Sequence, residues 1–207
     1  MKMTAAVLTL SLTILLMSGA AQAAETPTVR VKVAVDKVVG ILRDPALKGP
    51  AKTKERRTKI LQAVSGVFDW EEMAKRSLGQ YWRQRTPEEQ KEFVSLFSDL
   101  LERSYINRIE SYTDEKIIYD GEQVDAGYAT VKSRLINKRK EEIPVDYKLI
   151  QKNNEWYVYD LVIEDVSLVN NYRIQFNKII RSSSYAELVK KMKNKSESES
   201  FVTPGAE

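Results

Sequence analysis

The feature that most constrains the fold is a change in the spacing of apolar residues near Thr113. Before this point, apolar residues recur every three to four positions, which is typical of amphipathic helices. From residue 116 to 150 they alternate with polar residues, as in strands that have one covered face, and the segment 156–164 is apolar on both faces. Helical spacing returns at Leu168. Helices, then strands, then helices in one chain predict an α+β fold, with helices laid against one face of a sheet.

The alternating region predicts a four-stranded antiparallel meander. The expected strands cover residues 116–120, 128–136, 142–150 and 156–164, and the first is expected to end at Asp120-Gly121. The connections 137–140 and 152–155 are short and polar, as hairpin turns require. On its covered face the sheet is expected to present Val131, Val145, Tyr147 and Leu149.

A long helix is expected from residue 87 to 112. Thr86 is placed to cap it, Pro87 occupies its first position, and Glu89 stands three residues after the cap. At 1.5 Å per residue such a helix is about 39 Å long, enough to back a whole sheet. Shorter helices are expected over 28–43, 51–65, 168–180 and 185–192, with one more after an N-cap at Asp69.

The two ends of the chain differ in composition from the middle. Residues 1–23 have a positive start, an apolar run and the small-residue pattern Ala21-Gln22-Ala23, which together predict a secretory signal peptide cleaved after Ala23. Residues 24–195 are expected to form one α+β domain. The polar stretch 196–207 is expected to be a disordered tail.

Two absent residue types restrict the chemistry. The chain has 207 residues with no histidine and no cysteine. A Ser-His-Asp triad, a cysteine nucleophile, a zinc site of the usual kind and a disulfide are therefore excluded. We predict no catalytic residue and no metal site, and the remaining enzymatic alternative is an exported hydrolase that uses Asp160 with a nearby Tyr or Lys.

The residues alone leave open whether the apolar interior is a filled core or a cavity, and they favour a core. Abundant tyrosine, ten residues in all, points toward a cavity, because each buried hydroxyl needs a partner or a water. Three basic groups, within 52–59, 132–140 and 190–195, are most simply solvated faces. Docking to anionic phospholipid headgroups or to an acidic protein, as a structural adaptor would do, is the functional alternative. An exported chain with a net charge of only +4 is not expected to bind nucleic acid.

Several motifs resemble those of the MlaC family, periplasmic phospholipid-binding proteins also called toluene-tolerance auxiliary proteins. The resemblance extends over nearly the whole expected domain, and its most specific part is the last block. In chain order, the motifs are FDWEEMA (68–74), LGQYW (78–82), TPEEQKEF (86–93), IPVDY (143–147), WYVYD (156–160) and VSLVNNYRIQF (166–176). This chain has Asp165 where glycine is common in the family.

The resemblance implies a soluble, monomeric carrier in the periplasm that needs no cofactor. It implies that the carrier moves phospholipid between an outer-membrane lipoprotein–porin complex and an inner-membrane ABC transporter with an MCE-domain subunit, and so maintains outer-membrane lipid asymmetry. A hopanoid or other polycyclic lipid is the alternative cargo. The lipid tails are expected in an apolar cavity between sheet and helices, with Arg173 near the headgroup. The expected lipid-binding residues are Phe97, Leu101, Tyr105, Val131, Val145, Tyr147, Leu149, Leu168, Val169, Tyr172, Arg173 and Phe176.

Overall fold

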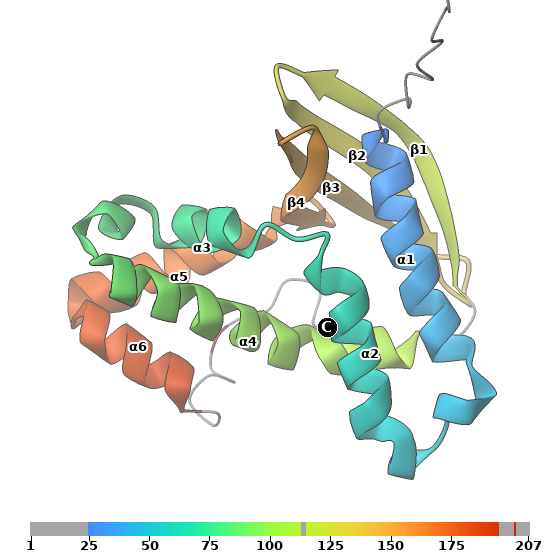
Figure 1. The fold of residues 1–207 in the computed structure, drawn as a ribbon, viewed down its shortest axis with the longest axis horizontal. Coiled ribbons are helices and arrows are strands. Elements are labelled where there is room, and N and C mark those ends of the chain that lie inside the picture. The colour runs from blue at the N-terminus through green and yellow to red at the C-terminus, as the bar shows by residue number, and fades with distance from the viewer. Residues whose placement is uncertain (1–24, 113–114, 195–200, 202–207) are drawn as a thin grey trace, which may run out of the picture.

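A five-stranded antiparallel sheet forms one side of the molecule in the computed structural model, which describes residues 25–112, 115–194 and 201 (Figure 1). The strands lie in the sheet in chain order, so the predicted α+β meander is confirmed. The strands are β1 (Lys116–Asp125), β2 (Tyr128–Ile136), β3 (Glu142–Lys152), β4 (Glu155–Ile163) and β5 (Val166–Ser167).

The fifth strand corrects the prediction of four. β5 has two residues, and it pairs antiparallel with the end of β4, with Val166 opposite Ile163. Glu164 and Asp165 make the turn between them, with φ of 49° and 64°. Positive φ at both central residues suits a tight hairpin turn and explains why glycine also fits at position 165. Two residues are too few to show an alternating pattern, so the sequence could not reveal this strand.

The first strand is longer than predicted. β1 continues past Asp120 to Asp125, and its pairing with β2 is interrupted by a bulge between Tyr119 and Gly121. Gly121 has φ of 132°, a conformation that side chains disfavour. The prediction of a strand end at Asp120-Gly121 is therefore wrong, because here glycine allows a bulge inside the strand.

Six α-helices occupy the described part of the chain on either side of the strand region. They are α1 (Pro27–Arg43), α2 (Thr53–Ser65), α3 (Trp70–Leu78), α4 (Pro87–Ser111), α5 (Leu168–Ser182) and α6 (Tyr185–Lys193). Short 3₁₀ turns connect them, namely η1 (Pro45–Leu47), η2 (Pro50–Lys52) and η3 (Gly79–Gln84).

The predicted helix caps are present. The Thr86 hydroxyl accepts a hydrogen bond from the Glu89 N–H at 3.2 Å, and the Glu89 carboxylate accepts one from the Thr86 N–H at 2.9 Å. This reciprocal capping box fixes where α4 begins. Asp69 caps α3 through a single bond, since its side chain accepts from the Glu72 N–H at 3.0 Å.

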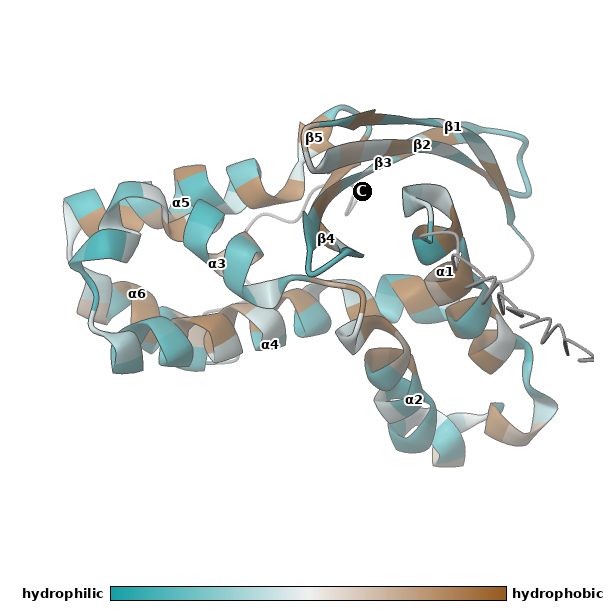
Figure 2. Cartoon of the chain, turned by 45° about the horizontal axis from the view of Figure 1, so that its top comes forward, coloured by the Kyte–Doolittle hydropathy of each residue, from teal (hydrophilic) through white to brown (hydrophobic). Residues whose placement is uncertain are grey.

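The helix that lies against the sheet is α1, which corrects the expectation that the long helix backs it. α1 packs on β1 and β2, and the sheet arches over it (Figure 2). Val31 of α1 is buried against Val131 and Leu149. α4 packs mainly on α3 and α6 instead. Its buried side chains, Phe93 and Phe97 among them, belong to a helical core rather than to the sheet.

The apolar interior therefore consists of two clusters. The helical cluster joins buried residues of α3 to α6, including Phe93, Phe97, Tyr172 and Phe176. The sheet cluster joins Val31 of α1 to buried residues of β2, β3 and β4. Phe68 and Leu161 pack against both clusters. The two cores meet along these two side chains.

The predicted signal peptide, residues 1–23, lies outside the described residues. Of the expected tail, Phe201 is described, and there the structure differs from the expectation of disorder. The Phe201 ring is 5% exposed and packs edge-on against Phe176 at a centroid distance of 5.5 Å. Within the described ranges, every helix is too short or too polar to span a bilayer.

Candidate functional site

The concave face of the sheet carries the alternating apolar residues that the sequence placed there. Val131 on β2 lies opposite Tyr147 on β3, and Ser133 lies opposite Val145. Tyr147 in turn lies opposite Leu161 on β4. Residues paired across antiparallel strands point to the same side, so these side chains share one surface. Figure 2 shows that the sheet curves toward the side on which α1, α2 and α4 lie.

The two ends of this surface differ in burial. At one end Ala129, Val131, Leu149 and Val158 are at most 4% exposed, because α1 covers them. At the other end the apolar and aromatic side chains are only half-buried. We call this second set the open half of the concave face; its members are Ile117, Tyr119, Leu135, Ile143, Val145, Tyr147, Leu161 and Ile163. Apolar surface that the fold leaves partly uncovered is available to an apolar ligand.

Of the sequence-predicted lipid-binding residues, four lie on this concave face. Val145 and Tyr147 belong to its open half, whereas Val131 and Leu149 are fully buried beneath α1. Only the first two could contact a ligand without displacement of α1.

Seven of the other predicted residues belong to the helical cluster or pack against it. Phe97, Leu101, Leu168, Val169, Tyr172 and Phe176 are buried there, and Tyr105 packs on it half-buried. The Phe97 ring meets both Tyr172 and Phe176 in edge-on contacts, at 5.5 and 5.7 Å between centroids. Such mutual packing fills the space between the helices, so these aromatic rings form a core rather than a cavity wall.

Arg173 lies on the surface of the helical lobe and not beside the concave face. It is exposed on α5 and donates a hydrogen bond to the Asn170 side chain at 2.5 Å. Its stem passes close to Gly79, where an added Cβ would lie 3.4 Å from the Arg173 Cδ. The structure therefore does not bring Arg173 together with Val145 and Tyr147.

Sequence reasoning missed Tyr119, a polar group of the open half. Tyr119 stands on β1 in register with Ser133, and its hydroxyl is buried with no hydrogen-bond partner among the described residues. Burial and the neighbouring Tyr147 raise the pKa of Tyr119 above its ordinary value of 10.0. The alternation within the predicted strand 116–120 could have found this residue, since it places Tyr119 on the same face as Ile117.

Tyr147 is a second neutral phenol on the same surface. Burial raises its pKa to about 12, and a hydrogen bond with Ser133 opposes that rise. Both phenols therefore stay protonated at physiological pH and can donate hydrogen bonds. An apolar surface with neutral donors suits a ligand that combines hydrocarbon with ester carbonyls.

Asp160, the candidate acid of a hydrolase, is fully engaged in holding α5. Its Oδ2 accepts a hydrogen bond from the Ser167 hydroxyl at 2.6 Å, and its Oδ1 accepts one from the Val169 N–H at 2.9 Å. The side chain is 8% exposed, and burial raises its pKa despite these bonds. The carboxylate anchors the start of a helix.

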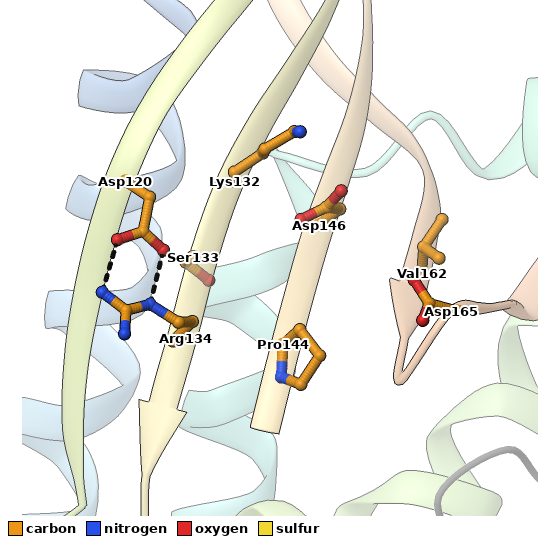
Figure 3. Close-up of a pocket in the computed structure, with 8 residues that line it drawn as sticks. All are labelled: Asp120, Lys132, Ser133, Arg134, Pro144, Asp146, Val162 and Asp165. Atoms are coloured by element: carbon orange, nitrogen blue, oxygen red, sulfur yellow. Dashed lines mark hydrogen bonds and ion pairs between the residues drawn. The ribbon is translucent and has the colours of Figure 1, made fainter. Parts of the chain in front are cut away.

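Two surface hollows lie away from the open half. One, of about 250 Å³, is on the convex side of the sheet (Figure 3). There the Arg134 guanidinium donates two hydrogen bonds to Asp120 and one to Glu142, joining β1, β2 and β3. The hydrogen bonds from Arg134 lower the pKa of Asp120. The lining of this hollow is largely polar, so it does not match the predicted apolar cavity.

The second hollow, of about 480 Å³, lies between α1 and α2 and includes Lys37 and Lys59 in its lining. Neither hollow includes any of the predicted lipid-binding residues. Within the described ranges, no three acidic side chains gather as a metal site would require.

Comparison with known proteins gives consistent results. The family model described as "MlaC protein" matches residues 32–194. The intermembrane phospholipid transport system binding protein MlaC of Haemophilus influenzae is 24% identical over 191 residues, which cover 90% of this chain and 89% of that protein. The solved structure of a phospholipid-binding protein from Ralstonia solanacearum, in complex with a phospholipid, is similar with a TM-score of 0.73 and 26% identity; the match covers 83% of this chain and 96% of that one.

Proposed function

Because the chain belongs to the MlaC family, we propose that it binds a phospholipid and transports it without chemical change. The similar proteins from H. influenzae and R. solanacearum are a phospholipid transport binding protein and a phospholipid-binding protein by name, which supports this proposal. The cargo is held through its hydrocarbon tails, and no cofactor takes part.

The observation that carries the proposal is the open half of the concave face. Six aliphatic side chains there are left half-buried although they belong to the inner side of the sheet, namely Ile117, Leu135, Ile143, Val145, Leu161 and Ile163. Acyl tails placed against them would complete their burial. Exposing the two tails of a phospholipid to water costs on the order of 20 kcal/mol, at about 0.8 kcal/mol per methylene. A carrier must offset most of this cost, and an uncovered apolar surface of this kind does so.

The polar groups of the site support binding rather than catalysis. Tyr119 and Tyr147 are neutral donors that can hydrogen-bond the ester region of a lipid without reacting with it. Asp160 already uses both carboxylate oxygens to hold α5. The proposed function therefore needs no nucleophile, and cargo can be released without breaking a covalent bond.

Location and partners complete the proposal. Cleavage after Ala23 would release the domain into the periplasm. There the protein would exchange lipid with an outer-membrane lipoprotein–porin complex and with an inner-membrane ABC transporter that has an MCE-domain subunit. This exchange would help to maintain outer-membrane lipid asymmetry.

Native mass spectrometry of protein purified from cells tests the proposal. We expect the wild-type chain to carry a bound mass that lipid extraction identifies as phospholipid. Val145→Trp places an indole on the open half and should abolish most of this bound fraction. The matched control is Val162→Trp, because Val162 is paired with Asp146 and lines the hollow on the convex side.

Three outcomes would contradict the proposal. They are a wild-type chain free of lipid under gentle ionisation, an equal loss of lipid in both tryptophan variants, and lysophospholipid or free fatty acid formed during incubation. A polycyclic lipid in place of a diacyl lipid would keep the carrier function but change the cargo.

A further inference from the structure

Positive charge is concentrated in one structural unit of this chain. We define the basic hairpin as residues 27–65, which comprise α1, the two 3₁₀ turns and α2. It contains ten Lys and Arg residues against three Asp and Glu, a net charge of +7 in a chain whose total is +4. The rest of the chain is therefore net negative. Such asymmetry creates a local positive field at the hairpin.

The hairpin projects from the rest of the molecule. The end of α1 and the start of α2, joined by η1 and η2, extend away from the sheet and from the helical lobe (Figure 1). This tip carries Arg43, Lys48, Lys52 and Lys54, all exposed. A projecting end can approach an extended surface before the rest of the molecule does.

The positive side chains of the hairpin differ in whether they are held by ion pairs. Arg56 and Arg57 are fixed, because both guanidinium groups pair with Glu110 of α4 at 2.6 Å and bind α2 to that helix. By contrast, Lys37, Lys48 and Lys54 are exposed and form no ion pair within the described part of the chain. The hollow between α1 and α2 places Lys37 and Lys59 at the same groove. Arg56 and Arg57 thus stabilise the fold, and Lys37, Lys48 and Lys54 are left to act outward. Lys32, Lys52 and Lys59 instead pair with acidic residues of the hairpin itself.

The residue type that carries the unpaired charge, lysine rather than arginine, indicates the kind of partner. Protein–protein interfaces are enriched in arginine and depleted in lysine, since long mobile lysines lose entropy when fixed in one geometry. An anionic lipid surface needs no fixed geometry, and each lysine near it contributes independently through its charge. Exposed unpaired lysines on a projecting hairpin therefore match a bilayer surface better than a shaped protein partner.

We propose that the basic hairpin docks on the surface of anionic phospholipid bilayers, with Lys48 and Lys54 at its tip and Lys37 on α1 as the contributing side chains. The docking is electrostatic and reversible, because the exposed apolar residues at the tip, Pro45, Ala46, Pro50 and Ala51, are too small to anchor in a membrane. It does not depend on lipid carriage by the concave face. Salt should weaken the docking steeply, because dissolved ions screen the attraction between charges more than about 10 Å apart at 0.1 M ionic strength.

Vesicle flotation tests the docking. Protein purified from cells is mixed at low salt with vesicles of phosphatidylcholine, or of phosphatidylcholine and phosphatidylglycerol in equal parts. We expect binding to the anionic vesicles alone. The triple variant Lys37→Gln, Lys48→Gln, Lys54→Gln should bind them on the order of 100-fold more weakly, from about fivefold per lysine.

The matched control removes the same charge elsewhere, through Lys91→Gln, Lys138→Gln and Lys178→Gln, all at exposed positions. It should retain binding within about twofold. Equal losses in the two triple variants would overturn the proposal, because net charge would then explain the binding. Cross-linking of the hairpin to an acidic protein, together with no vesicle binding, would overturn it as well. Bound lipid in the same samples, measured by mass spectrometry, reports on the carrier function separately.

Discussion

Asp160 on β4 accepts the backbone N–H of Val169, in the first turn of α5, at 2.9 Å. This bond connects the sheet to the helical lobe at the point where the chain passes from one to the other. Ser167 completes the link, since its hydroxyl donates to Asp160 and accepts from the Asn170 N–H. The start of α5 is thereby fixed relative to the sheet.

Replacing Asp160 with alanine should lower the free energy of unfolding by about 1–3 kcal/mol, since it leaves a helix N–H and a hydroxyl without a partner. Urea denaturation measures the change. The control is Asp165→Ala, at an exposed turn position. It should lower the unfolding free energy less, because it affects only local turn geometry. A loss of bound lipid from Asp160→Ala protein that has kept its full stability would contradict the structural role.

Asp160 should also make the stability of the fold depend on pH. Burial raises the pKa of Asp160 above its ordinary value of 3.8, so the folded chain holds this proton to higher pH than the unfolded chain does. The resulting stabilisation is complete below pH 3.8 and is lost as pH rises through the raised pKa. The difference in unfolding free energy between wild type and Asp160→Asn, measured from pH 3 to pH 8, should change in favour of the variant as pH rises. A difference that stays constant over this range would refute the prediction.

Glu110 should be important for the attachment of α2 to α4. Burial opposes ionisation of Glu110, but hydrogen bonds from Arg57 and Arg56 outweigh it and lower its pKa. Glu110→Gln should therefore cost about 1–3 kcal/mol of stability near neutral pH. The extra stability of the wild type over Glu110→Gln should be present above pH 4.5. It should disappear as pH falls through the lowered pKa of Glu110. Asp99→Asn, on the exposed side of α4, should change the midpoint of chemical denaturation little at any pH.

Tyr119→Phe separates binding from folding. The Tyr119 hydroxyl is buried with no partner in the described part of the chain, so its removal should not lower the unfolding free energy. If the phenol donates to a bound phospholipid, lipid affinity should fall by about 2- to 10-fold, the effect of one hydrogen bond. Lipid exchange followed by mass spectrometry measures this ratio. Tyr157→Phe, whose phenol donates to Glu155, is the matched control and should bind lipid as the wild type does.

Phe201 should stabilise the helical lobe from the end of the chain. Its ring is buried against Phe176 and Tyr172. Phe201→Ala should lower the unfolding free energy by about 1.5–3 kcal/mol, the value of burying such a side chain. Phe201→Leu should recover part of this loss. Identical thermal midpoints for wild type and the alanine variant would show that the ring contributes nothing to the lobe.

Local signals in the sequence predicted the elements well, because their causes are local. Thr86 and Glu89 mark the start of α4 in the sequence, because their reciprocal pair of hydrogen bonds spans only four consecutive positions. The alternation on β2 and β3 likewise determined which side chains share a face, and the register of Val131 with Tyr147 agrees with it. Gly121 misled the prediction because glycine serves both turns and bulges, and only the pairing partner distinguishes them.

Which elements pack together could not be predicted in this way. The helical spacing of apolar residues before Thr113 shows that Phe97 and Leu101 are covered, but not whether a sheet or other helices cover them. In the structure α1 packs on the sheet through Val31, whereas α4 packs in the helical cluster. The expected lipid-binding set was consequently divided, and Tyr119 was omitted although it lies within the predicted first strand.

The division into two cores that meet at Phe68 and Leu161 has a mechanical consequence. Each core can keep its own packing while the two cores move slightly relative to one another, since few side chains pack against both. A small rotation about this contact would therefore change how far the open half beside Leu161 is exposed, without unfolding either core.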